Sequence, residues 1–286
     1  MDHKISHNEI KLIVLDLDGT LLNSKKELSP GNYAALEQAA AKGIYVVPCT
    51  GRFFKAMPEC IRSLPFLRYA ITINGADIYD AKADKSLYSA PITPERADEV
   101  FAALDTLPVI YDCFQDGWGW IDQEFYKVCE KYSPPDMSRE YIRSLRSPVE
   151  NFRKVIKERG RGVQKIQMFY LDQQLRSKML EEIPRWFPDL NVTTSISNNI
   201  EINSREAHKG NALLELCRHL QIDPSQTMAF GDGMNDLTML QTAAVGVAMG
   251  NAAPKVKEFA NYITDTNDND GVAKAVRLFC LGEQES

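Results

Sequence analysis

The stretch KLIVLDLDGTLL, residues 11–22, constrains the fold of this chain more than any other segment. Its apolar run Leu12–Leu15 ends abruptly in two aspartates, a glycine and a threonine. A strand that is apolar on both faces is typical of the centre of a parallel sheet, and ligands of such sheets gather beyond the carboxyl ends of the strands. We therefore expect Asp16, Asp18 and Thr20 at a ligand-binding edge.

The spacing of the two aspartates allows two interpretations. Side chains two residues apart on a strand point to the same face, so both carboxylates could face one small volume and bind a cation. The pattern Asp-x-Asp-Gly is also common in turns, because aspartate bonds to its own backbone and glycine accepts a positive φ. The rest of the chain must decide between these interpretations.

Strands and helices alternate in the first 75 residues and again from residue 209 to the end. This alternation predicts an α/β fold with a doubly wound, Rossmann-like parallel sheet and right-handed crossovers. The predicted strands cover residues 12–15, 44–49, 69–73, 227–230 and 245–249. The predicted helices cover residues 30–41, 53–64, 211–220, 237–242, 254–260 and 271–281.

The rhythm changes between these two parts, from about residue 86. Here we predict helices over residues 93–107 and 173–187, a hairpin around Asp116-Gly117, and loops with one or two helices over residues 132–162. An alternating strand over residues 164–171 and a hairpin turning at Asn198-Asn199 complete the segment. At 286 residues the chain is long enough for two domains. We predict a core of residues 1–87 and 200–286, interrupted by an inserted α+β cap domain of residues 88–199.

Composition narrows the class of protein. The formal net charge of -6 argues against a nucleic-acid partner, which normally requires a clustered basic surface. The six cysteines are scattered without a CxxC pair, so we expect neither a zinc site nor a disulfide framework. No segment approaches the run of about 18 apolar residues that a membrane helix needs. We expect a cytoplasmic protein, a monomer or weak homodimer, with no nucleic-acid or membrane partner.

Four polar clusters stand at strand ends or helix starts, at residues 16–18, 50–51, 209–210 and 231–236, and a doubly wound core would bring them to one edge. Carboxylates of Asp16, Asp18 and Asp232 are oxygen ligands suited to Mg²⁺ rather than zinc. The same point would receive hydrogen-bond donors from Thr50, Lys209 and Asn235. Donors beside a magnesium ion describe a phosphate site.

A carboxylate next to Mg²⁺ can attack phosphorus and form an acyl-phosphate that water later hydrolyses. The second carboxylate, that of Asp18, would protonate the leaving oxygen and then deprotonate the water. None of the four histidines adjoins a serine or cysteine placed as a competing nucleophile.

These clusters resemble the four motifs of the haloacid dehalogenase (HAD) superfamily of phosphatases. In chain order their sequences are DLDGT, TGR, KG and GDGMND. The position of the insertion resembles the Cof-type branch, subfamily IIB, with a C2B α/β cap. Further likeness lies in Asn74-Gly75-Ala76, in residues 248–252 and in residues 270–273.

The resemblance implies a role for each motif residue. Asp16 would be the nucleophile and a metal ligand, and Asp18 the acid/base and a ligand through its backbone carbonyl. Asp232 would complete the protein ligands, with Asp236 supporting them. The groups that would hold the phosphoryl oxygens are the backbone at Leu17 and Gly51 and the side chains of Thr50, Lys209 and Asn235. Arg52 we interpret as a structural or rim charge.

The predicted function is Mg²⁺-dependent hydrolysis of small phosphorylated metabolites through an aspartyl-phosphate, with the cap selecting the substrate. Sugar phosphates are the first expectation, followed by nucleotide or cofactor phosphates such as those of flavin or pyridoxal. Two alternatives stay open. One is a phosphotransferase or mutase of the same fold, and the other is a non-catalytic sensor of phosphorylated metabolites.

Overall fold

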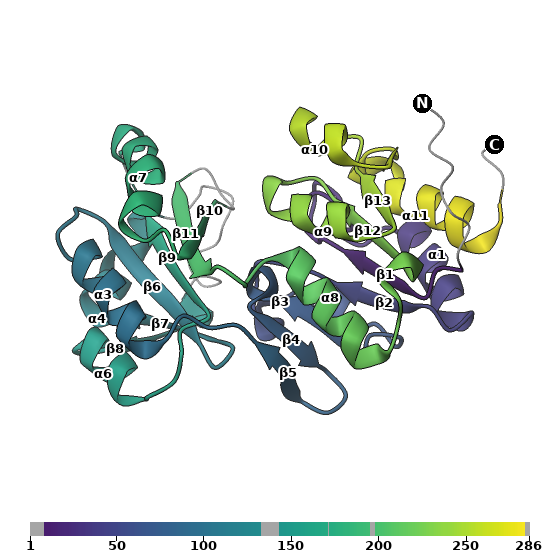
Figure 1. The fold of residues 1–286 in the computed structure, drawn as a ribbon. Helices are drawn as coiled ribbons and strands as arrows, with labels where there is room; N and C mark the ends of the chain where they lie inside the picture. The colour runs from purple at the N-terminus through teal and green to yellow at the C-terminus, as the bar shows by residue number, and fades with distance from the viewer. Residues whose placement is uncertain (1–8, 133–142, 171, 195–197, 284–286) are drawn as a thin grey trace. The chain divides into compact units, whose positions relative to one another are not determined.

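The computed structural model describes residues 9–132, 143–170, 172–194 and 198–283, and the chain divides into two compact units (Figure 1). The first unit combines Met1–Tyr88 with His208–Ser286, and the second is Ser89–Ala207. Among the described helices, none has the length and apolar character needed to cross a membrane.

The first unit is built on a five-stranded parallel sheet, which confirms the predicted fold class. Its central strand β1 (Leu12–Leu15) is fully buried, as the apolar run predicted. Pro48 ends the edge strand β2 opposite Leu15, a position where a missing backbone N–H is tolerated. The strands, in spatial order, are β14 (Tyr262–Ile263), β13 (Val245–Ala248), β12 (Thr227–Gly231), β1 and β2 (Tyr45–Pro48).

The order of these strands creates a switch point between β1 and β12. The chain moves from β1 to β2 in one direction and from β12 to β13 in the other, so right-handed crossovers place the connecting helices on opposite faces. Ligands of doubly wound sheets bind in the crevice at such a point. The helices of this unit are α1 (Pro30–Ala41), α2 (Glu59–Arg62), α8 (Lys209–Leu220), α9 (Leu237–Thr242), α10 (Pro254–Phe259) and α11 (Gly271–Val276).

Two predictions for this unit were wrong in part. The strand β3 (Tyr69–Thr72) meets the parallel sheet only through an isolated parallel bridge between Ile71 and Cys49. It otherwise pairs antiparallel with β4 (Asp77–Asp80), which lies beside β5 (Lys85–Ser89) in a separate three-stranded sheet. The helix predicted over residues 53–64 is a 3₁₀ turn followed by α2. Pro58 separates the two, because a proline cannot donate the hydrogen bond that would continue the first turn.

The second unit contains a six-stranded mixed sheet. Asp116 and Gly117 both have positive φ and join β6 (Ile110–Gln115) to β7 (Trp118–Asp122), as the predicted hairpin requires. The hairpin predicted to turn at Asn198-Asn199 corresponds to the antiparallel pairing of residues 190–193 with residues 201–204. Its connection includes residues 195–197, which lie outside the described part of the chain. The strands, in spatial order, are β10 (Leu190–Thr193), β11 (Asn199–Ser204), β9 (Lys165–Phe169), β6 (Ile110–Gln115), β7 (Trp118–Asp122) and β8 (Arg146–Val149). The helices that lie wholly within the described residues of this unit are α3 (Pro94–Leu104), α4 (Gln123–Val128), α6 (Phe152–Glu158) and α7 (Gln173–Trp186).

The limit between the units differs from the predicted boundary at residue 199. Strand β11 pairs with β9 and β10, so residues 200–207 belong to the second unit rather than to the core.

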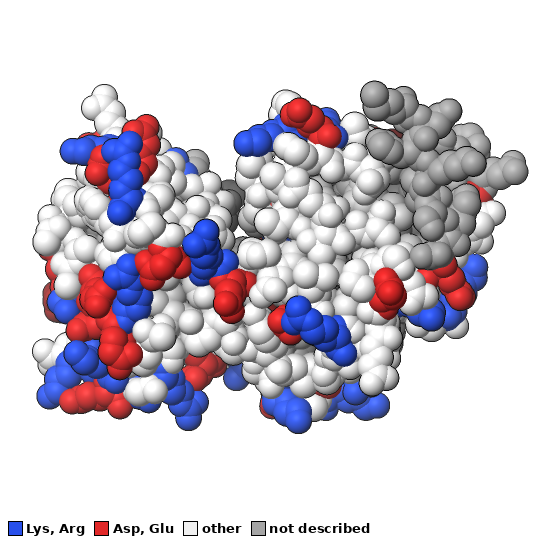
Figure 2. Space-filling view, viewed as in Figure 1, with Lys and Arg blue, Asp and Glu red and all other residues white. Residues whose placement is uncertain are grey.

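On the face drawn in Figure 2, Lys and Arg side chains are interspersed with Asp and Glu side chains.

Candidate active site

The loop after β1 folds back over the end of β12 at the switch point. The backbone N–H of Asp16 donates to Phe230 O at 3.0 Å, and the Thr20 hydroxyl donates to Asp232 Oδ1 at 3.0 Å. Gly19 has a φ of 89°, and a Cβ at this position would lie 2.5 Å from Asp232 Oδ2. Only glycine therefore lets this loop approach the Asp232 carboxylate so closely.

Lys209 links three of the predicted motifs at one point. Its side chain is fully buried, and its Nζ donates to Asp16 Oδ1 and to Asp236 Oδ1, both at 2.6 Å. The lysine is the first residue of α8, which His208 caps through a hydrogen bond from the Asn211 N–H. The sheet and the start of α8 therefore bring together residues that lie almost 200 positions apart in the sequence.

Asp236 supports the neighbouring loop as well as the lysine. Its Oδ2 accepts the backbone N–H groups of Asp232 at 3.0 Å and of Gly233 at 2.9 Å, while its Oδ1 accepts from Lys209. Both carboxylate oxygens are thus engaged within the protein. This geometry suits a residue that supports metal ligands more than one that coordinates the metal itself.

Three carboxylates crowd around one ammonium group. Ligand oxygens of Asp16, Asp232 and Asp236 lie within 4.8 Å of one another. Burial raises the pKa of Asp16 to about 8; Lys209 opposes this rise, and Asp236 and Asp232 add to it. Burial, reinforced by Asp236, likewise raises the pKa of Asp232 to about 6. A divalent cation bound to Asp16 and Asp232 would favour their ionised forms, so the donor set fits Mg²⁺.

The environment of Lys209 favours its charged form, whereas burial favours the neutral forms of Asp16 and Asp232. Burial lowers the pKa of a lysine, but the adjacent Asp16 and Asp236 outweigh burial and hold the pKa of Lys209 well above its usual value. The ammonium is therefore a fixed positive charge at the bottom of the site.

The carboxylate of Asp18 lies outside this acidic cluster. Arg52 donates from Nε to Asp18 Oδ2 and from Nη2 to Asp18 Oδ1, each at 3.0 Å, and Lys26 Nζ donates to Oδ1 at 2.9 Å. Burial alone would raise the pKa of Asp18, but Arg52 and Lys26 outweigh burial and lower it. Any contact of Asp18 with the metal is thus better made by its backbone carbonyl, as the resemblance implied.

The remaining predicted residues lie in the same loops. Thr50 is 2% exposed, and its Oγ1 accepts the Arg52 N–H at 3.3 Å, which leaves the hydroxyl proton to donate elsewhere. Gly51 follows it, and the Arg52–Asp18 pair joins this loop to the loop that contains Leu17. Asn235 lies in the 3₁₀ turn Met234–Asp236, directly before Asp236.

Sequence reasoning missed the pairing of Arg52 with Asp18, because Arg52 was interpreted as a structural or rim charge. The side chain of Arg52 is 25% exposed and forms a two-bond fork with the predicted proton carrier. The only signal in the sequence was its place immediately after Thr50-Gly51. The contact of Lys26 with Asp18 had no sequence signal.

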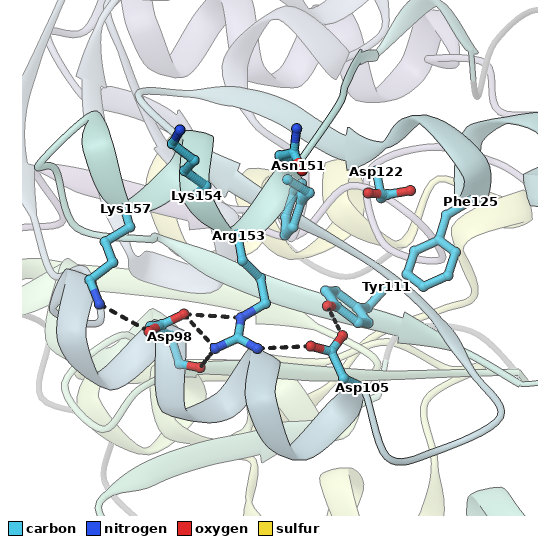
Figure 3. Close-up of a pocket in the computed structure, with 10 residues that line it drawn as sticks. Asp98, Asp105, Tyr111, Asp122, Phe125, Asn151, Arg153, Lys154 and Lys157 are labelled. Atoms are coloured by element: carbon cyan, nitrogen blue, oxygen red, sulfur yellow. Dashed lines mark hydrogen bonds and ion pairs between the residues drawn. The ribbon is translucent and has the colours of Figure 1, made fainter.

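The second unit has a hollow of its own, of about 600 Å³, between α3, α4 and α6 (Figure 3). Its arginine, Arg153, donates to Asp98 and Asp105, and Lys157 also pairs with Asp98. The side chains of Arg153 and Lys157 are 37% and 58% exposed, so these ion pairs are in contact with solvent. At the switch point, Lys209 is fully buried between two carboxylates, and burial makes its charge effective. The switch point is therefore the stronger candidate for an active site.

Comparison with known proteins gives consistent matches along the chain. A family model described as haloacid dehalogenase-like hydrolase matches residues 13–276. The chain is 32% identical over 274 residues to the 5-amino-6-(5-phospho-D-ribitylamino)uracil phosphatase YcsE of Bacillus subtilis, and the match covers 96% of this chain and 97% of that protein.

Two solved structures extend this similarity to the fold. A haloacid dehalogenase-like hydrolase from B. subtilis superposes with a TM-score of 0.79 at 31% identity, covering 94% of this chain and 99% of the other. The HAD subclass IIB sugar phosphatase BT4131 superposes with a TM-score of 0.77 at 26% identity, covering 94% and 98%.

Proposed function

We propose that this chain, which belongs to the haloacid dehalogenase-like hydrolases and is a phosphatase of that family, removes phosphate from small phosphorylated metabolites by way of a phosphoryl group carried on Asp16. The observation that carries this proposal is the contact of buried Lys209 with both Asp16 and Asp236 at the switch point. Lys209 binds one oxygen of Asp16 and so directs the other, Oδ2, to the role of nucleophile.

The proposed cofactor is Mg²⁺, held by carboxylate oxygens of Asp16 and Asp232 and by the backbone carbonyl of Asp18. The ion would neutralise charge on the phosphoryl oxygens and on the carboxylates around it. Asp236 would orient Asp232 and its loop through the two backbone hydrogen bonds that it accepts.

In the first step, Asp16 Oδ2 attacks phosphorus, and the bond from phosphorus to the ester oxygen breaks. Lys209 and the Thr50 hydroxyl, with the Asn235 amide, hold the phosphoryl oxygens while this transfer takes place. The leaving oxygen takes a proton from the Asp18 carboxyl and departs as an alcohol. Arg52 and Lys26 lower the pKa of Asp18, so this step requires the negative charge of the bound phosphate ester to favour the protonated form of Asp18.

In the second step, a water molecule attacks the phosphorus of the aspartyl-phosphate. The Asp18 carboxylate accepts one proton from that water, and the bond between phosphorus and Asp16 breaks. Inorganic phosphate leaves, Asp16 returns to a carboxylate, and Asp18 regains the proton that it lost in the first step. The cycle therefore balances without another reactant.

The proposed substrate class is phosphate esters of sugars or of sugar-alcohol chains. The B. subtilis relative is named for a substrate with a phospho-D-ribityl chain, and BT4131 is described as a sugar phosphatase. Both names point to phosphate esters of polyhydroxylated compounds.

The experiment that tests this function measures phosphate release from a panel of sugar, sugar-alcohol, nucleotide and cofactor monophosphates, with Mg²⁺ and with EDTA. We expect release that depends on Mg²⁺ and is fastest with the sugar and sugar-alcohol esters. Binding of these esters without phosphate release would contradict the proposal and favour a sensor. Preferential transfer to an added sugar would favour a phosphotransferase.

Replacing Arg52 with glutamine should impair proton delivery more than phosphoryl binding, because Arg52 positions the Asp18 carboxylate. Loss of Arg52 would also raise the pKa of Asp18 and favour its protonated form, so a loss of rate requires positioning to outweigh that change. Protonation of a leaving group contributes roughly 10²–10⁴-fold to rate, and nitrophenolate departs without it. We expect Arg52→Gln to slow hydrolysis of an alkyl phosphate at least about tenfold more than hydrolysis of p-nitrophenyl phosphate.

Arg62→Gln is the matched control, because Arg62 lies in the same segment and donates to the backbone carbonyl of Met57. It should affect both substrates equally and weakly. An equal loss on both substrates in Arg52→Gln would show that Arg52 has no selective effect on the proton carrier.

A further inference from the structure

Three consecutive residues after β3 have backbone conformations that L-amino acids rarely adopt. The φ angles are 54° at Ile73, 58° at Asn74 and 93° at Gly75. A β-branched residue with positive φ is a clear outlier, and such strain persists only where the surrounding structure determines it. We name residues 73–75 the left-handed turn.

One side of the left-handed turn holds the loop that contains Thr50. The N–H of Asn74 donates to Thr50 O at 3.0 Å, and the N–H of Ile73 donates to Arg52 O at 2.9 Å. In return, the N–H of Thr50 donates to Ile71 O at 2.9 Å. The carbonyls on both sides of Gly51 are therefore bound by the turn.

The other side of the turn contacts the backbone at the start of α8. A Cβ on Gly75 would lie 2.5 Å from His208 O and 3.0 Å from Lys209 N. These neighbours are backbone atoms, which cannot move without moving Lys209. Ile73 and Asn74 are 0% and 4% exposed, so the left-handed turn itself is buried.

We propose that the left-handed turn is a positioning element of the phosphate site. It packs between the loop of residues 50–52 and the first residue of α8, and so sets the separation of Thr50 from Lys209. Its strained backbone brings both groups to one phosphoryl group in a single, rigid arrangement. The inference rests on the proposed function, in which these two residues bind the same phosphate.

The test compares Gly75→Ala with Gly43→Ala. Gly43 also has a positive φ, of 85°, but a Cβ there meets nothing within 4 Å. Both variants share the backbone strain, and only Gly75→Ala disturbs the contact with Lys209. Misplacement of reacting groups by about 1 Å can cost on the order of 10²-fold in rate, so we expect a loss of kcat/KM of that order in Gly75→Ala.

Two readouts separate positioning from stability. We expect the inhibition constant of inorganic phosphate, measured with Mg²⁺, to rise several-fold more in Gly75→Ala than in Gly43→Ala. Thermal unfolding of both variants reports the loss of stability that strain causes. Equal phosphate affinities in the two variants would overturn the inference.

A second pair keeps the test decisive if Gly75→Ala does not fold. Asn74→Gly keeps the backbone N–H and accepts positive φ, whereas Asn74→Val has a β-branched side chain that opposes it. We expect phosphate affinity near that of the wild type in the first variant and clearly weaker in the second. Equal losses in both would assign the effect to the asparagine side chain and overturn the inference.

Asp16→Asn is assayed in parallel to distinguish the two proposals. Retained turnover in this variant would contradict the proposed function. The phosphate affinities of the glycine and asparagine variants would still decide the inference about the turn.

Discussion

Asp16→Asn should abolish turnover, with kcat lowered by at least about 10⁴-fold, because an amide cannot take the place of the attacking carboxylate. The fold should be retained, since Lys209 keeps its ion pair with Asp236 at 2.6 Å. The substitution also removes one of three crowded carboxylates. Phosphate release from p-nitrophenyl phosphate, followed with Mg²⁺ and a large excess of substrate, measures the effect.

The control for this variant is Asp84→Asn. Asp84 is exposed and has a φ of 50°, a conformation that asparagine tolerates. We expect its kcat to match that of the wild type. If Asp16→Asn kept a tenth or more of the wild-type kcat, Asp16 would not be the nucleophile.

Lys209→Met should have the second large effect, on both activity and stability. Removing one partner of a buried ion pair leaves an uncompensated charge and costs about 3–5 kcal/mol in the free energy of unfolding. Here two carboxylates, those of Asp16 and Asp236, lose the same ammonium. Loss of a preorganised donor to the transferring group should also lower kcat/KM on the order of 10²–10³-fold.

Lys165→Met separates these two effects. Lys165 is the matched buried lysine of the second unit, 2% exposed and paired with Glu201 at 2.9 Å. Its loss should destabilise the protein by a comparable amount and leave the affinity for inorganic phosphate unchanged. Denaturant unfolding and phosphate inhibition measure the two quantities. Unchanged phosphate affinity in Lys209→Met would contradict the assigned role of Lys209.

Much of the fold could be predicted where a local pattern determines the structure. The uniform apolar run of β1 indicated a strand buried on both faces, and β1 spans Leu12–Leu15 as predicted. The helix predicted over residues 30–41 is α1, which begins at Pro30 after the N-cap Ser29, whose Oγ accepts the Asn32 N–H. The motif resemblance to the haloacid dehalogenase superfamily was confirmed by the family model and by the solved structures.

The errors arose where partner choice, rather than local pattern, decides the structure. Strand β3 has an apolar sequence that suits either sheet, and its pairing with β4 depends on the turn at residues 73–75. Strand β8 was missed, because Arg146–Val149 contains a proline and lacks apolar alternation. The predicted domain boundary at residue 199 differs from the observed limit of the second unit because the pairing of β11 with β9 has no signal in the local sequence.

The candidate site also contains both predictable and unpredictable features. The sequence order of the motifs indicated which residues would meet, and the structure brings Asp16, Lys209, Asp232 and Asp236 together. Contacts between side chains of different loops could not be predicted. The fork from Arg52 to Asp18 depends on the distance between two loops that are 34 residues apart. The catalytic roles of these residues stay predictions.

The central claim is that the phosphoryl group passes through Asp16, and chemical trapping tests it most directly. Wild-type enzyme is quenched in acid during turnover with Mg²⁺ and a good substrate, then treated with borohydride, which reduces an aspartyl-phosphate to homoserine. Peptide mass mapping then identifies the reduced residue. The account predicts homoserine at position 16 in the reacting enzyme and aspartate there without substrate. Reduction at another residue, or unmodified Asp16 during active turnover, would contradict it.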